Sequence, residues 1–290
     1  MKKTFILVAA MACTLASYAA DIWTGTHAVS WDNTIKIEAD KFADAKVGDK
    51  LTLAFVATDG GDVIELKSDG DKLPGTRFYP FGADATSMET YITADMLHVL
   101  QATGLEVCGT KFTVSTIKVE NVGYEMPEGA IWAGNFWCDN WKTLELWKTA
   151  FDTYANQRYL VVNLSKEEYA YDYDLNIIST WEQGAFADWQ NTTKEQTRVI
   201  LDTQVLEGGL LAAIEGNDRV MFQGNCQVEG KGFNITSIVL TNSLSGEITT
   251  INESVVETAN DGRIYTIMGQ EVSEPTQGIY IRNGKKIVVF

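Results

Sequence analysis

Histidine, proline and cysteine are scarce in this 290-residue chain, which holds two histidines, four prolines and four cysteines. So few prolines exclude long proline-rich linkers. The sequence has no Cys-x-x-Cys pair and no Cys/His cluster, which argues against a zinc site. It also has no nucleophile elbow, no phosphate-binding glycine loop and no paired metal-binding histidines. We therefore expect no cofactor and no enzyme of these common classes.

Long hydrophobic runs are missing after the N-terminus. Residues 1–20 hold two lysines, an apolar run too short for a membrane helix, and small residues before Asp21. This pattern predicts a signal peptide and an exported protein, extracellular or at the outer cell surface, with the periplasm as the alternative. Cys13 leaves lipidation open, although the residues before it match a lipobox poorly.

Basic residues are few. Removing the leader with its two lysines would leave 21 basic against 39 acidic residues, a net charge of −18. Such a surface repels phosphate backbones and anionic headgroups, so nucleic acid and membrane surfaces are poor partners. The charge instead suits a soluble exported protein with a neutral partner.

Three cysteines would remain after cleavage, and an odd number cannot form a complete disulfide set. Cys138 and Cys226 lie in the same expected domain, residues 130–243, and are the candidate pair. The alternative is that both are buried thiols that behave as small hydrophobic residues.

The sequence contains an approximate copy of itself. IWTG at 22–25 matches IWAG at 131–134, and KFTVSTIKV at 111–119 matches GFNITSIVL at 232–240. Order and spacing hold over about 100 residues, which is too long for a solenoid repeat and predicts a duplicated domain. We expect a first domain at 21–124, a second domain at 130–243, a linker at 244–260 and a C-terminal module at 261–290.

Within each copy, short apolar or alternating runs are separated by turn clusters such as TDGGD and SDGDKLPG. About eight short strands per copy predict an all-β fold with two antiparallel sandwiches, jelly-roll-like in type. One helix is expected at 93–104, with Thr93 as its N-cap and Gly104 as its end. The acidic turns lack the full ligand spacing of a calcium loop, so solvated turns are favoured over a structural calcium site.

Aromatic residues are concentrated in the second copy. Trp23 and Trp132 are matched between the copies and are expected in the core, whereas Trp31 and Trp141 are less clear. Large aromatics near loops of an exported sandwich indicate a binding surface, and a pyranose ring stacks on an indole while its hydroxyls meet nearby polar groups. The candidate platforms are Trp137, Trp181 and Trp189, with Asp174 and Asn176 as hydroxyl partners.

The tail resembles a known export signal. Its elements IY, GQ-V, GIYI and NGKK, between 264 and 286, are similar to the C-terminal sorting domains of secreted Bacteroidota proteins, the cargo of type IX secretion. The resemblance implies an interaction with secretion machinery and leaves open whether the tail is removed after export. It departs from that pattern at the hydrophobic end, IVVF.

The duplicated domains also resemble tandem jelly-roll modules of secreted proteins from such bacteria. The shared features are the IW-G opening, a following tryptophan and the closing F-[TN]-[VI]-[ST]-[TS]-I. Related modules look like carbohydrate-binding modules, which implies a non-catalytic protein that binds a neutral polysaccharide or oligosaccharide. The first alternative is a structural or adhesive surface protein with protein partners. The second is a glycoside hydrolase, because that chemistry needs only two suitably spaced carboxylates.

Overall fold

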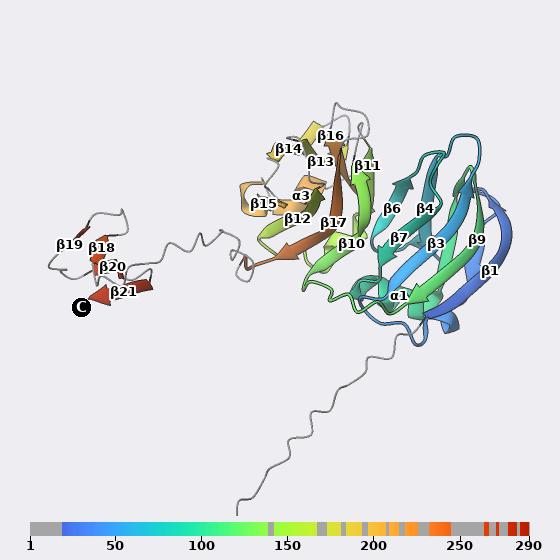
Figure 1. The fold of residues 1–290 in the computed structure, drawn as a ribbon, viewed down its shortest axis with the longest axis horizontal. Helices are drawn as coiled ribbons and strands as arrows, with labels where there is room; N and C mark the ends of the chain where they lie inside the picture. The colour runs from blue at the N-terminus through green and yellow to red at the C-terminus, as the bar shows by residue number, and fades with distance from the viewer. Residues whose placement is uncertain are drawn as a thin grey trace, which may run out of the picture. The chain divides into compact units, whose positions relative to one another are not determined.

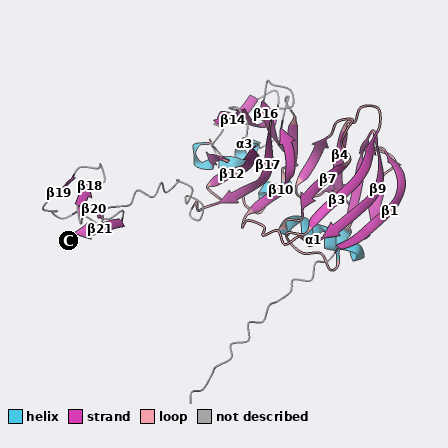
Figure 2. Cartoon of the chain, viewed as in Figure 1, coloured by secondary structure: helices cyan, strands magenta, loops and turns pink. Residues whose placement is uncertain are grey.

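A computed structural model gives the fold of the chain (Figures 1 and 2). The chain divides into two compact units, residues 1–243 and 244–290, each described by itself. The structure describes residues 19–138, 142–166, 173–180, 184–192, 197–206, 209–214, 218–225, 232–244, 264–266, 271–272, 278–282 and 285–289.

The first unit contains both halves of the sequence repeat, called here the first copy (19–124) and the second copy (130–243). The first copy is built almost entirely of strands, with one short helical turn and one longer helix. Its elements are β1 Ala19–Val29, β2 Ile35–Ile37, η1 Ala39–Phe42, β3 Lys50–Ala57, β4 Val63–Ser68, β5 Asp71–Lys72, β6 Thr76–Pro80, β7 Ser87–Tyr91, α1 Ala94–Thr103, β8 Leu105–Thr110 and β9 Phe112–Glu120.

The second copy repeats these elements in nearly the same order. They are β10 Ala130–Cys138, β11 Thr143–Trp147, α2 Thr149–Asp152, β12 Tyr159–Lys166, β13 Tyr173–Thr180, β14 Gly184–Thr192, β15 Arg198–Asp202, η2 Thr203–Val205, α3 Gly209–Ile214, β16 Arg219–Asn225 and β17 Phe233–Thr241.

Strand order identifies each copy as a jelly roll. In the first copy one sheet has the order β1-β9-β3-β7 and the facing sheet β2-β8-β4-β6. The second copy has β10-β17-β12-β15 and β11-β16-β13-β14, which are the same orders with the repeat offset applied. Two interleaved four-stranded sheets of this kind form a double Greek key. The predicted all-β fold of tandem jelly-roll-like sandwiches is confirmed.

Alternation along the strands explains the two hydrophobic cores. Leu66 and Ile177, which the repeat aligns, are both buried, as are the aligned Leu51 and Leu160. Alternate residues of a strand face opposite sides of a sheet, so one parity fills the space between the facing sheets. Each copy has its own buried cluster.

The predicted helix is confirmed as α1. The Thr93 hydroxyl accepts a hydrogen bond from the backbone N–H of Met96, and Gly104 ends the helix with a φ of 83°. A threonine N-cap satisfies one of the backbone donors left free at a helix start, and glycine adopts a positive φ at a helix end without a Cβ clash.

The two copies are joined strand to strand. β7 of the first copy pairs with β10 of the second, through Thr90 and Gly134, and β6 pairs with β11. Each facing sheet therefore continues from one copy into the other, as eight strands in one sheet and nine in the other (Figure 1). We call this junction of β6, β7, β10 and β11 the seam.

Buried side chains also cross the seam. Trp132, which is 1% exposed, donates its indole N–H to the Thr76 hydroxyl at 2.9 Å. The Thr90 hydroxyl donates to the carbonyl oxygen of Ala133 at 3.0 Å. The expectation that Trp132 lies in the core is confirmed, and its match Trp23 is partly buried against the first core.

The second unit is a four-stranded antiparallel sheet in the order β19-β18-β20-β21. Its strands are β18 Ile264–Thr266, β19 Glu271–Val272, β20 Gly278–Arg282 and β21 Lys285–Val289. Arg282 pairs with Lys285 at one end of the ladder between the last two strands. The domain boundaries at 124, 130 and 261 stay predictions.

Candidate functional site

A hollow of about 400 Å³, open to solvent, lies at one end of the seam. Its walls come from β6 and the chain that follows it in the first copy, and from β10 and the start of the β11 region in the second. The lining residues are Tyr79, Pro80, Phe81, Gly82, Ala85, Ser87, Phe136, Trp137 and Lys142. Neither copy forms this hollow without the other.

Trp137 faces the hollow because side chains alternate along β10. Phe136 and Cys138 point into the second core, where both are buried. Trp137 stands between them, so it faces the other side of the sheet and is half-buried.

The indole of Trp137 is held against the backbone at Gly232. A Cβ built at Gly232 would lie 2.9 Å from Cε2 and Cζ2 of that indole. Only a residue without a side chain allows such close approach. One part of the ring is therefore fixed by the protein, which pre-orients the indole in the wall of the hollow.

Tyr79 and Phe81 tie the hollow to both cores. The Tyr79 ring meets Phe136 edge to face at 5.4 Å, and Phe81 meets Phe55 and Phe112 at 5.0 and 5.6 Å in the first core. Tyr79 packs against both buried clusters. These rings give the hollow a rigid apolar floor.

Burial raises the pKa of Tyr79 to about 12, with Glu89 and then Cys138 adding to the shift. The hydroxyl therefore stays protonated at physiological pH. It donates to the carbonyl oxygen of Asn135 at 3.3 Å. The site thus combines fixed aromatic surfaces with the neutral hydroxyl of Tyr79, the hydroxyl of Ser87 and the ammonium group of Lys142, a set suited to a ligand with an apolar face and a polar rim.

The other predicted site residues lie elsewhere. Asn176 and Asp174 are on β13, opposite Gln223 and Asn225 of β16, and Trp189 is on the adjacent strand β14. Strands β13 and β14 belong to the nine-stranded sheet, and β16 and β11 separate them from β6 at the seam. None of these three residues lines the hollow, and their part in a site stays a prediction, while Trp181 lies outside the described residues.

The cysteine pairing stays a prediction. Cys138 is buried in the second core, and Cys226 lies outside the described residues. Cys108 is buried in the first copy. Within the described part of the chain, no three His, Cys, Asp or Glu side chains are grouped to hold a metal ion.

Sequence reasoning found Trp137, but did not bring it together with Tyr79 and Phe81. It missed Lys142 and Ser87. No local signal could have joined them, because they lie on separate segments that meet only where β7 pairs with β10.

A second group of aromatics lies on the nine-stranded sheet. Trp31, which is 46% exposed, meets Phe78 edge to face at 6.1 Å and has the Lys67 ammonium 6.0 Å from its ring centre. Arg77 lies over both Phe78 and Trp147, at 4.5 and 4.8 Å. Cations already cover part of these rings, so the hollow is the stronger candidate for a ligand.

Comparisons with known proteins give limited overlap. No family model matches the chain, and no curated protein matches it. One similar solved structure is the SGBP-B protein of the Bacteroides ovatus mixed-linkage glucan utilization locus, in complex with a mixed-linkage heptasaccharide. Sequence identity is 24% and the TM-score 0.31, and the match covers 35% of this chain and 28% of that chain.

Another similar structure is a protein of Parabacteroides distasonis described as secreted. Identity is 7% and the TM-score 0.20, over 78% of this chain and 86% of that one. At TM-scores below 0.5, neither likeness assigns a function to this chain. In the described residues, none of the helices has the length and apolar character needed to cross a bilayer.

Proposed function

We propose that this protein is an exported, non-catalytic glycan-binding protein that holds a neutral polysaccharide in the hollow at the seam. The observation that carries the proposal is the Trp137 indole, half-buried and fixed against Gly232 in the wall of an open, aromatic-lined hollow. A sugar ring would stack its C–H face on that indole, and the Tyr79 and Ser87 hydroxyls would meet its rim.

Charge and chemistry support a neutral ligand and binding without hydrolysis. The chain has a net charge of −16 even with its basic leader, which disfavours polyanions. The described lining of the hollow contains no carboxylate, whereas glycoside hydrolysis needs two. Export and an interaction of the tail with secretion machinery remain part of this proposal, on the sequence features of the two ends of the chain.

The test is native gel electrophoresis in soluble neutral polysaccharides, comparing the parent protein with Trp137→Ala. Loss of an aromatic contact worth about 1–2 kcal/mol should raise the Kd about 5- to 30-fold. Trp31→Ala is the matched control, because it removes an exposed tryptophan that does not line the hollow. Circular dichroism confirms that both variants fold.

Each outcome points to a different site or function. Retardation lost in Trp137→Ala and kept in Trp31→Ala supports the hollow. Retardation lost only in the double variant Trp181→Ala/Trp189→Ala would keep glycan binding but move it to the region of β13 and β14. Absence of retardation across a broad panel would contradict glycan binding, and release of reducing sugar would indicate a hydrolase.

A further inference from the structure

The seam is a joint between two kinds of strand edge. The first copy contributes β7 and β6. These are the last strands in the sheet orders β1-β9-β3-β7 and β2-β8-β4-β6, and we call them the trailing edges. The second copy contributes β10 and β11, its leading edges. Across the seam Arg77 pairs with Glu145 at 3.1 Å, and Trp132 and Thr90 make the hydrogen bonds described above.

The same two kinds of edge stand at the outer ends of the two sheets. Among the described strands, β1 and β2 end the sheets on the first-copy side, and β15 and β14 end them on the second-copy side. By strand order, β1 and β2 are the leading edges of the first copy. β15 and β14 are the trailing edges of the second.

The leading edge β1 has the same irregular backbone as β10. Its register against β9 shifts between Asp21 and Trp23, and again between Thr24 and His27. The shifts in β10 fall at the aligned positions, between Ala130 and Trp132 and between Ala133 and Phe136. The edge that β10 presents to β7 is thus repeated in β1. β1 has eleven residues and contains neither the lysine nor the proline that commonly protects an edge strand from pairing with another chain.

Apolar side chains are left uncovered at both ends. Trp23 is only partly buried, whereas its match Trp132 is 1% exposed at the seam. On the second-copy side Leu201 is partly buried, Ile200 is 39% exposed and Val205 is 74% exposed. Covering such side chains is the main favourable term in protein association.

Charges at the two ends are complementary. The repeat aligns β2 with β11, and β8 with β16. Lys36 is the central residue of β2, which pairs with β8, and Glu145 is the central residue of β11, which pairs with β16, so the two residues hold equivalent positions. Asp188 holds the position in β14 that Arg77 holds in β6, by the same repeat offset that aligns Tyr79 with Gln190. The Glu–Arg pair of the seam is thus replaced by a Lys and an Asp.

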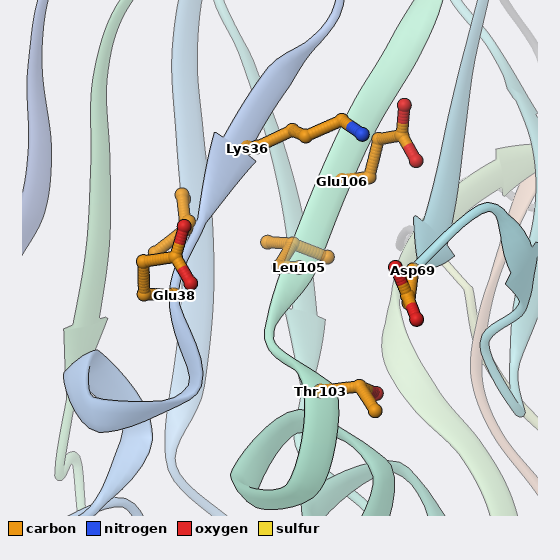
Figure 3. A pocket seen from close by; sticks show the side chains of 7 residues that line it. Lys36, Glu38, Asp69, Thr103, Leu105 and Glu106 are labelled. Atoms are coloured by element: carbon orange, nitrogen blue, oxygen red, sulfur yellow. The ribbon is translucent and has the colours of Figure 1, made fainter.

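Lys36 is accessible for such a pairing. It is exposed on the outermost strand of its sheet and lies beside Glu106 of β8, in a shallow polar pocket that also includes Glu38, Asp69 and Thr103 (Figure 3). The Glu106 carboxylate already accepts from the Thr34 hydroxyl at 2.8 Å and from the Gly70 N–H at 3.2 Å. Lys36 is an exposed cation at this edge.

We propose that the β15/β14 end of one molecule binds the β1/β2 end of a second copy of this chain, repeating the seam between molecules. The contact is head to tail, so it leaves one end of each kind free and extends into an open chain of molecules. This assembly does not depend on glycan binding.

The test is sedimentation velocity of the exported form, beginning at Asp21 and retaining the tail. Concentrations run from about 5 to about 500 μM, which brackets weak association, in about 0.15 M salt to screen the overall negative charge. The parent protein should form dimers and longer chains as concentration rises. Lys36→Glu and Asp188→Lys, each alone, should be monomeric over the same range.

A charge swap gives the decisive comparison. The double variant Lys36→Glu/Asp188→Lys, and an equal mixture of the two single variants, should both regain assembly because opposite charges again meet. Ile200→Lys should weaken assembly independently of that pair. Lys41→Glu, an equal charge change on exposed η1, should leave it unchanged.

The inference is overturned if the parent protein stays monomeric at every concentration. It is also overturned if assembly survives both single variants, or if the charge swap fails to restore it. Circular dichroism of each variant shows that a monomeric result reflects the edges and not misfolding.

Discussion

Replacing Thr76 by valine tests the seam at a single atom. The Thr76 hydroxyl is the acceptor for the Trp132 indole N–H at 2.9 Å, and both residues are buried. Valine has nearly the same shape as threonine, so little packing changes. The indole donor, however, would be left buried and unpaired, which costs about 1–3 kcal/mol.

The matched control is Thr52→Val. The Thr52 hydroxyl is buried and has no hydrogen-bond partner among the described residues. Removing a polar atom that already lacks a partner should be neutral or slightly stabilising. The two substitutions are chemically identical, so the difference between them isolates the bond across the seam.

Urea unfolding followed by circular dichroism provides the free energies. A cycle with Trp132→Phe separates the bond from the loss of ring volume, and we expect a coupling between the two positions of about 1 kcal/mol. If Thr76→Val costs no more than Thr52→Val, or if the cycle shows no coupling, the hydrogen bond does not stabilise the seam.

Two further predictions concern the first copy. Burial, and next the carboxylate of Glu65, raise the pKa of the Cys108 thiol to about 12, compared with about 8.5 in an unfolded chain. The unfolded state thus releases this proton at lower pH than the folded state, so the free energy of unfolding should fall as pH rises from about 8.5 towards 12. The urea midpoint of Cys108→Ala should fall less over that range than the midpoint of the parent protein. Gly104→Ala should lower the free energy of unfolding by about 3 kcal/mol or more, since its φ is 83° and a Cβ would lie 2.1 Å from the Ile37 carbonyl oxygen. Gly70→Ala, with a φ of 75° and open space around the new Cβ, should lower it by about 1 kcal/mol. Equal thermal shifts for the two glycine variants, or identical pH profiles for parent and Cys108→Ala, would contradict these assignments.

Local patterns predicted much of each copy. The aligned pair Trp23 and Trp132 predicted inward positions, and Thr93 and Gly104 predicted the ends of α1. Such features depend on near neighbours in the chain: strand alternation, an N-cap and a left-handed helix end are short-range. A duplicated pattern adds a second, independent sample of the same constraints.

The hollow depended on contacts that short-range patterns do not encode. Trp137 was identified as an aromatic platform, but its position beside Tyr79 and Phe81 depends on the pairing of β7 with β10. Asp174, Asn176 and Trp189 were predicted as partners in the same function and lie on β13 and β14, and their part in a site stays a prediction. Residues far apart in sequence come together only through sheet order.

The sequence by itself determined the all-β class, the duplication and the helix α1, because each follows from local periodicity or capping. Tertiary structure alone decided that each sheet of the first copy continues into the second, and that a hollow forms beside Trp137. It also decided that Trp132 is buried with its indole N–H bonded to Thr76, while Trp23 is only partly buried. Strand edges carry the same backbone donors and acceptors whatever their side chains, so the sequence does not specify which edges meet.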